Sequence, residues 1–320
     1  MKGGESGFHG KNSSKIVSPS NSTATQPAPS ASCTKNVRVE WNNMAEADKL
    51  WYVQSARCLM DAPPLGVWAE ARSIWDEMAW VHDYVTPGVH RVDVFLPWHR
   101  YFIHLYKTLL AGHCAYTGPI PWLRESNYAG NFAGSGAFQP KYFGSLPPLS
   151  DKGEGTCITD GPFANTTVPV GPNAPSCLSR GENKEITANA TMAAVELCHG
   201  DANTRYTQHR RCVERTIHAT GHVGIGPTMS LFSTSPGDPA FFLHHGFVDW
   251  QWKRWQDADG ARSTSVSGCV EYPEEDSDDA PCVPMTRDTV LTSMGLVPDL
   301  TVGDVIDTEN DILCYTYDEF

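Results

Sequence analysis

Six of the twelve histidines form two groups of three, and members of both groups fall on the apolar side of a predicted helix. His82 continues the apolar stripe of a helix predicted over residues 67–84. His245 lies on the stripe of a helix that is predicted to open at Asp238-Pro239, a cap followed by proline in the first turn. Burying several imidazoles without a purpose is costly, so we expect the fold to bring them together. The first group is His82, His90 and His99, and the second is His218, His222 and His245.

His218 and His222 are four residues apart within a helix predicted over residues 207–223. Side chains at this spacing project from one face, a turn apart, so both imidazoles can reach one metal ion. The zinc-protease version of this motif needs Glu directly after the first histidine, and Ala219 stands there instead. The pair therefore indicates a metal site of another kind.

The register of the helix predicted from Asp238 onward places two adjacent histidines on different faces. His245 is in line with Phe241 and Trp252, whereas His244 points about 100° away. Two sets of three histidines, with no cysteine or carboxylate ligand in either motif, suit copper better than calcium or magnesium. Neutral imidazole binds both Cu(I) and Cu(II). Six histidines have no predicted role: His9, His104, His113, His199, His209 and His244.

Hydrophobic periodicity predicts a mainly α chain, with further helices over residues 44–60 and from Pro97 to Gly112. Residues 118–190 are rich in Gly, Pro, Asn and Ser and are predicted to form a long irregular excursion. Residues 1–32 contain almost no apolar side chains and are predicted to be a flexible tail. One domain is predicted over residues 33–320.

Ten cysteines without a C-x-x-C pair predict up to five disulfides and an oxidising compartment. Four glycosylation sequons support secretion. The N-terminus lacks the apolar core of a signal peptide, so we interpret the chain as a mature or trimmed form. The sequons begin at Asn12, Asn21, Asn165 and Asn189.

Charge and hydropathy exclude two classes of partner. The formal net charge of −13 leaves no basic face for nucleic acid. No apolar run of 18 residues occurs, so no membrane span is expected.

Three stretches of the sequence resemble the tyrosinase and catechol oxidase (polyphenol oxidase) family, in the style of its short, secreted fungal members. They are "HRVDVFLPWHRYF", "HATGHVGIG" and "DPAFFLHHGFVDWQW", in the family's order. The resemblance implies two copper ions, the first bound by His82, His90 and His99. It assigns the second copper to His218, His222 and His245. It also implies a four-helix bundle around the metals, wrapped by long disulfide-tied loops.

The same resemblance extends to residues that brace the fold. Arg100 and Asp249 match a pair that forms a buried ion pair in the family. Tyr315 and Tyr317 match a tyrosine motif that closes the catalytic domain, and Arg38 matches its N-terminal partner. Few residues follow this motif, so the resemblance implies a form without the C-terminal lid of longer members.

Departures from the family pattern narrow the expected activity. Gly88 stands where some members carry the cysteine of a thioether. Ala219 stands where many monophenol-hydroxylating members carry an asparagine that helps to orient a water molecule. Glu214 resembles the acid that holds this water, so it is the candidate catalytic carboxylate. Ala219, Val223, Met229 and Phe232 are expected to shape the substrate pocket.

The resemblance therefore implies oxidation of o-diphenols to o-quinones, with O2 reduced to water. The expected partners are a small phenol and O2. A tyrosinase that hydroxylates monophenols and an o-aminophenol oxidase remain alternatives. An oxygen carrier of the haemocyanin kind is a further alternative, which the lack of a shielding domain disfavours.

Overall fold

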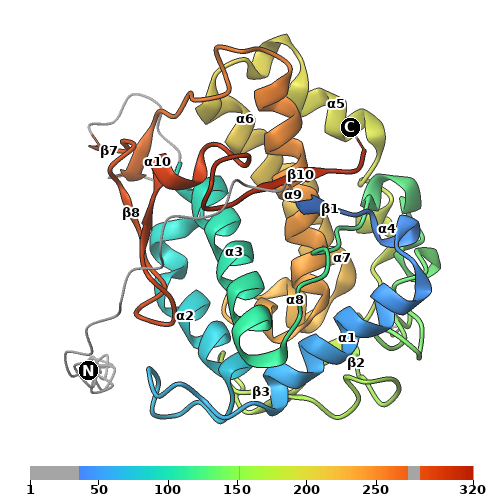
Figure 1. Cartoon of the computed structure of the whole chain (residues 1–320). Helices are drawn as coiled ribbons and strands as arrows, with labels where there is room; N and C mark the ends of the chain where they lie inside the picture. The colour runs from blue at the N-terminus through green and yellow to red at the C-terminus, as the bar shows by residue number, and fades with distance from the viewer. Residues whose placement is uncertain (1–35, 151, 273–281, 320) are drawn as a thin grey trace, which may run out of the picture.

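The structure is a computed structural model that describes residues 36–150, 152–272 and 282–319. The fold is mainly helical, as predicted, and its described residues share one apolar core. Long helices run through the centre of the molecule (Figure 1). They are α2 (Ile74–Val89), α3 (Phe95–Cys114), α9 (Ala240–Asp257) and a continuous run of α6 (Tyr206–Val213), η5 (Glu214–His218) and α7 (Ala219–Ile225). The predicted tail, with Asn12 and Asn21, lies outside the described residues.

Aromatic side chains join the central helices. Tyr106 of α3 stacks on Phe242 of α9, with ring centroids 3.7 Å apart. Trp75 of α2 packs edge-on against both rings, at 5.8 and 5.7 Å. Such pairs contribute about 0.5–1.5 kcal/mol each beyond the area they bury. The three helices therefore share an aromatic cluster that fixes their spacing.

The first helix of the chain packs on this core from one side. α1 (Glu46–Asp61) agrees with the prediction over residues 44–60. It packs against α3, and the Cys58–Cys114 disulfide joins the C-terminal ends of the two helices.

The prediction that a helix begins near residue 67 is wrong, because α2 begins at Ile74. Ser73 caps the helix by accepting a hydrogen bond from the backbone N–H of Asp76 at 3.0 Å. The carboxylate of Glu77 accepts hydrogen bonds from four consecutive backbone N–H groups, of residues 65–68. These bonds satisfy the backbone N–H groups of residues 65–68, which therefore need no helix to be hydrogen-bonded. At its other end α2 runs beyond the predicted Tyr84 to Val89.

The helix predicted over residues 207–223 extends from Tyr206 to Ile225 and contains a π-helical turn, η5. The backbone N–H of Ala219 donates to the carbonyl of Glu214, five residues earlier, which is the signature of this turn. π-Helical turns occur frequently at functional sites. This one contains His218 and ends directly before Ala219.

Residues 118–190 are irregular, as predicted, apart from short elements. These are η2 (Glu125–Tyr128), η3 (Phe132–Gly134), β2 (Thr156–Cys157), β3 (Thr167–Val168), β4 (Ser176–Cys177), β5 (Ser179–Arg180) and α4 (Lys184–Thr187). The strands form two short antiparallel pairs, β2 with β5 and β3 with β4. The Cys157–Cys177 disulfide ties the two pairs together.

One helix, α5 (Met192–His199), was not expected from the sequence. Its N-cap is Thr191, whose side chain accepts a hydrogen bond from the backbone N–H of Ala194 at 3.2 Å. The Cys198–Cys212 disulfide joins α5 to α6. Helix α5 has only eight residues, too few for a clear apolar period.

The segment after α9 returns across the bundle in short pieces. They include β6 (Cys269–Glu271), β7 (Val283–Pro284), β8 (Val290–Leu291), β9 (Leu300–Thr301) and α10 (Val302–Val305). Cys269–Cys282 is the fourth disulfide between described residues, and none of the described cysteines is free. The last strand, β10 (Tyr315–Tyr317), pairs in parallel with β1 (Asn36–Arg38), so segments far apart in sequence lie side by side (Figure 1). Over the described ranges, no helix combines the length and apolarity that a membrane crossing requires.

Candidate metal centre

The first group of histidines converges on one buried point. His82 projects from α2, His90 follows the end of that helix, and His99 lies on α3. Their ring centroids are 5.1 Å apart for His82 and His90, 4.9 Å for His90 and His99, and 5.7 Å for His82 and His99. One nitrogen of each ring lies within 4.8 Å of one nitrogen of the others, a spacing suited to one metal ion.

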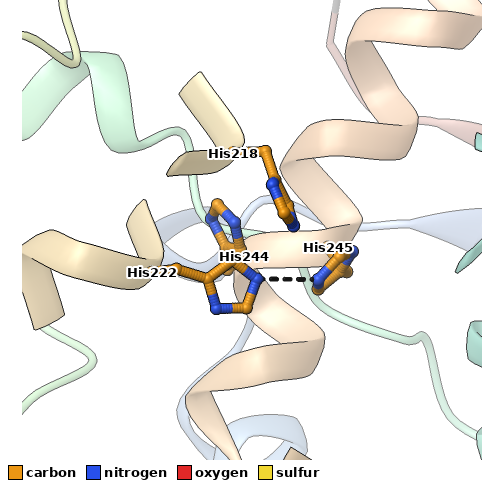
Figure 2. Close-up of side chains that lie close together, drawn as sticks. All are labelled: His218, His222, His244 and His245. Atoms are coloured by element: carbon orange, nitrogen blue, oxygen red, sulfur yellow. Dashed lines mark hydrogen bonds between the residues drawn. The ribbon is translucent and has the colours of Figure 1, made fainter. Parts of the chain in front are cut away.

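The second group converges in the same way. His218 of η5 and His222 of α7 face His245 of α9, with each ring centroid 5.2 Å from that of His245 (Figure 2). The Nε2 atoms of His222 and His245 are 3.1 Å apart. Both rings are buried in the protein.

The two groups are in direct contact, through His99 of α3 and His245 of α9. His99 stacks on His245 with ring centroids 4.4 Å apart and an angle of 8° between the planes. His90 and His218 are 6.1 Å apart. Two metals held by the two groups would therefore be close neighbours in one centre.

Backbone carbonyls orient four of the six rings. The Nδ1 atoms of His90, His99, His218 and His222 lie 2.8–3.3 Å from the carbonyls of Thr86, Phe95, Glu214 and Met229. A histidine that donates from Nδ1 presents Nε2 as a lone pair, the form that binds metal. The Nε2 atoms of His82, His99 and His218 are buried without a hydrogen-bond partner. An orphaned acceptor of this kind fits a metal ligand.

Burial also keeps the rings in the ligating protonation state. Desolvation lowers the pKa of His90 to about 4. For His82, His99, His218, His222 and His245, burial followed by the proximity of other histidines lowers the pKa well below its ordinary value. All six are neutral near pH 7 and able to bind copper without first losing a proton.

His244, for which the sequence predicted no role, lies beside the second group (Figure 2). Its ring is 4.7 Å from that of His222 and 5.6 Å from that of His218. Its Nδ1 is 2.8 Å from the carboxylate of Glu125, which is 1% exposed. Its position around α9 is as predicted, but α7 packs on that side of α9, and helix register alone could not show this.

A buried ionic cluster braces the helices that carry the histidines. Arg100, next to His99, donates from Nε to Asp249 at 2.5 Å. Arg38 donates to the same carboxylate at 2.8 Å, and the hydroxyls of Tyr315 and Tyr317 donate to it at 2.5 Å each. Four of the five residues matched to the family pattern thus donate to the carboxylate of the fifth, Asp249.

The charges of this cluster decide the pKa of Asp249. Burial alone would raise it, but the positive charges of Arg100 and Arg38 outweigh burial and lower the pKa. The carboxylate therefore stays ionised inside the core.

Glu214, the candidate catalytic carboxylate, is held by protein groups on both oxygens. Oε1 accepts from the backbone N–H of Arg91 at 2.6 Å, and Oε2 accepts from Arg210 at 2.8 Å. Arg210 also binds Asp93, at 2.9 Å. Burial is the largest influence on Glu214 and raises its pKa, against the opposing charge of Arg210.

A cavity of about 430 Å³ opens on the second histidine group. The four residues predicted to shape a pocket, Ala219, Val223, Met229 and Phe232, all line it, together with His218 and His222. Val223 and Phe232 are 42% and 39% exposed, so they lie at its mouth. Arg91 and Arg215 also line this cavity and were not identified from the sequence.

The two predicted glycosylation sites within the described residues, Asn165 and Asn189, are both exposed. Asn165 has a left-handed backbone, with φ of 59°. The amide of Asn189 donates to two carbonyls of the preceding turn, those of Glu185 and Ile186.

Sequence comparisons agree with this geometry. The family described as "Tyrosinase: Common central domain of tyrosinase" matches residues 72–258, which include all six predicted ligands. Tyrosinase P of Aspergillus terreus is 32% identical over 280 residues, covering 73% of this chain and 78% of the relative. N-acetyl-6-hydroxytryptophan oxidase of Emericella nidulans is 27% identical over 351 residues, covering 88% and 92%.

Solved structures give the same fold. A polyphenol oxidase variant from Thermothelomyces thermophila aligns with a TM-score of 0.76 at 27% identity and covers 89% of each chain. A functional unit of octopus hemocyanin aligns with a TM-score of 0.56 at 16% identity, covering 89% of this chain and 68% of that one. The second likeness concerns the fold alone.

Proposed function

The chain belongs to the tyrosinase family of copper-dependent phenol oxidases, and from this premise we propose that it is a catechol oxidase. In this reaction an o-diphenol loses two electrons and two protons to give an o-quinone. Oxidation of two catechols reduces one O2 to two waters. The finer assignment, catechols rather than monophenols, depends on the surroundings of Glu214 and Ala219.

We assign the two coppers of this family to the two histidine groups: His82, His90 and His99 for one, and His218, His222 and His245 for the other. When bound, the copper pair supplies the redox chemistry, binding O2 and accepting electrons from the phenol. The chain supplies six neutral imidazoles, four of them oriented by backbone carbonyls.

The observation that carries the proposal is that protein groups occupy both carboxylate oxygens of Glu214. Both of its oxygens already accept hydrogen bonds from protein groups, Arg91 N–H and Arg210. A carboxylate used in this way is poorly placed to orient a water molecule that deprotonates a monophenol. Ala219 beside it offers no side-chain amide to hold such a water. Catechols need less help with deprotonation, so the site favours them.

The cavity at the second histidine group supports an enzyme rather than an oxygen carrier. Its lining combines His218 and His222 with small or apolar side chains and with three charged residues, and exposed Val223 and Phe232 lie at its mouth. Phe232 also packs over His90, with ring centroids 4.5 Å apart. A planar ring that enters between the two apolar side chains would reach the second histidine group.

We also propose that the protein works in an oxidising compartment and is secreted. The four disulfides between described cysteines support this, as do the exposed sequons at Asn165 and Asn189. Expression from the native gene in a fungal host tests it: glycosylated protein should accumulate in the medium. Retention of unglycosylated protein in the cytosol would overturn this part of the proposal.

Oxygen uptake by the copper-loaded protein tests the proposed activity. We expect uptake with 4-methylcatechol and little with the matching monophenol, p-cresol. Equal uptake with both would make the protein a tyrosinase. Uptake with o-aminophenol in preference to catechol would favour the aminophenol oxidase. Reversible oxygenation without uptake would indicate a carrier.

A further inference from the structure

The second histidine group has a neighbour that is not among the six assigned ligands. The ring centroid of His244 lies 4.7 Å from that of His222, 5.6 Å from that of His218 and 5.2 Å from that of His245 (Figure 2). One nitrogen of each of these four rings lies within 4.8 Å of one nitrogen of every other ring. The spacing that suits three of these rings to one metal ion therefore holds for the fourth as well.

Glu125 orients the ring of His244 as a metal ligand requires. Its Oε1 lies 2.8 Å from Nδ1 of His244, and both residues are 1% exposed. A carboxylate oxygen accepts a hydrogen bond, so Nδ1 donates it and Nε2 keeps a lone pair. Histidines that bind metals commonly donate their other ring nitrogen to a carboxylate or a carbonyl in this way. His244 therefore has the support that a ligating histidine needs.

The Nε2 atom of His244 is buried, and no described residue forms a hydrogen bond with it. The Nε2 atoms of His99 and His218 are orphaned in the same way. Buried polar atoms are almost always paired, so each exception needs an explanation. A metal ion explains the orphaned nitrogens of the assigned ligands, and the same explanation fits His244.

His244 and His245 differ in how they lie relative to the first group. The ring of His245 stacks on that of His99, at 4.4 Å. The ring of His244 lies instead against Glu125 and against Gly221 of α7. A metal ion bound by all four nitrogens would therefore lie farther from the first group than one bound by the three assigned ligands. His245 serves both positions, so its loss weakens both.

We propose that His244 is a seventh metal ligand: when the first group is empty, a single copper ion in the second group binds His244 as a fourth nitrogen. Four nitrogen ligands close the coordination of a metal ion, whereas three leave a position open for chemistry. The four-nitrogen position suits the first ion to arrive, and the three-nitrogen position suits the complete pair. The inference rests on the assignment of the second group to copper and is independent of which phenol the enzyme oxidises.

Pulsed EPR counts the imidazoles that bind a single Cu(II) ion, so it tests the proposal without turnover. His90→Asn disables the first group, and one equivalent of Cu2+ is then added. We expect four bound imidazoles in this variant and three when His244→Asn is combined with it. Three in both proteins would overturn the inference. His199→Asn is the matched control and should leave the count at four, because His199 lies between the carbonyls of Val195 and Gln251, outside both groups.

The affinity for Zn2+, measured by competition with a chelator, tests the support from Glu125. In the His90→Asn background, Glu125→Gln should raise the Kd for Zn2+ roughly 10- to 100-fold, the usual effect of losing a carboxylate behind a ligating histidine. His244→Asn should raise it at least as much. Glu196→Gln is the control, because Glu196 pairs with Arg254 at the surface and should leave the Kd unchanged. An unchanged Kd in His244→Asn would overturn the inference.

The unmodified chain gives a measurement that does not depend on the folding of any variant. One equivalent of Cu2+ added to the metal-free protein should give the signal of four bound imidazoles, because four nitrogens hold the ion more tightly than the three of the first group. A signal from three imidazoles would mean that the first ion binds without His244, which would overturn the inference. Failure to bind any copper would contradict the assignment of the metal centre itself.

Discussion

A methyl group placed on Gly221 would lie 2.3 Å from the ring of His244. Gly221 sits in α7 between His218 and His222, and the imidazole of His244 fills the space that its missing side chain leaves. The carboxylate of Glu125 lies 2.8 Å from Nδ1 of that imidazole, and its other oxygen would lie 2.9 Å from the added methyl group. The close approach of α7 and α9, which brings the second histidine group together, thus depends on a residue without a Cβ.

Gly221→Ala should therefore weaken copper binding at the second group. No Cβ contact as short as 2.3 Å is tolerated, so either the His244 ring or the helix must move. We expect about one copper per chain instead of two, measured by elemental analysis, and a destabilisation of roughly 1–3 kcal/mol. Gly112→Ala is the control, since a Cβ there meets nothing within 4 Å in α3. It should stabilise the fold by up to about 1 kcal/mol.

Two substitutions at adjacent positions test which histidine of α9 binds the metal. His245→Asn should reduce the copper content to about one per chain. His244→Asn should keep two coppers but lower stability, because Glu125 loses a buried partner, at a cost of about 1–3 kcal/mol. Copper counts of two for His245→Asn and one for His244→Asn would reverse the assignment.

Asp249→Asn should cost about 3–5 kcal/mol, because it leaves Arg100 and Arg38 buried without their counter-charge. Urea unfolding at pH 7 measures this. The control is Asp257→Asn in the same helix, where the carboxylate is 44% exposed and pairs with Lys253. Its effect should stay within about 0.5 kcal/mol. Equal effects of the two substitutions would contradict the bracing role of Asp249.

The same residue predicts a dependence on pH. The pKa of Asp249 is lowered in the folded protein, so its unfolded form takes up a proton first as pH falls. Its contribution is therefore complete well above the ordinary value of 3.8 and is lost as pH falls through the folded pKa. The stability difference between the unmodified protein and Asp249→Asn should shrink below about pH 4. A difference that grows in acid would contradict the sign of the shift.

Ala219→Asn should raise monophenol hydroxylation by less than about tenfold, or 1.4 kcal/mol. The new amide could hold a water molecule, but Glu214 stays engaged with Arg210 and the N–H of Arg91. The measurement is the ratio of p-cresol to 4-methylcatechol turnover. Ala219→Leu, of similar size but without the amide, is the control. A gain far above tenfold would mean that Glu214 can leave its protein partners.

The sequence predicted the long helices and the histidine groups well because both depend on local regularity. The stripe that leads to His82, and the four-residue spacing of His218 and His222, are properties of single helices. The Arg100–Asp249 pair, and Arg38 as the partner of the tyrosine motif, were expected from family resemblance. That both sets meet at one carboxylate was not expected, since no local pattern links Arg38 to α9.

What the sequence could not predict depends on packing between distant segments. Glu77 prevents a helix at residues 65–68 through hydrogen bonds that no periodicity reveals. The place of His244 beside the second group follows from the approach of α7, and Glu125 comes from a loop that was predicted only as irregular. Arg91 and Arg215 likewise come to line one cavity only because separate segments of the chain pack together.

The carboxylate of Asp249 receives Arg38 from the beginning of the described chain and Tyr317 from near its end. During synthesis on the ribosome, all six histidines emerge before the strand that contains Tyr317. Until β10 pairs with β1, the nascent bundle lacks both tyrosine hydroxyls that donate to Asp249, the partner of the arginine beside the third histidine. The brace between the metal-bearing helices is thus complete only in the finished polypeptide.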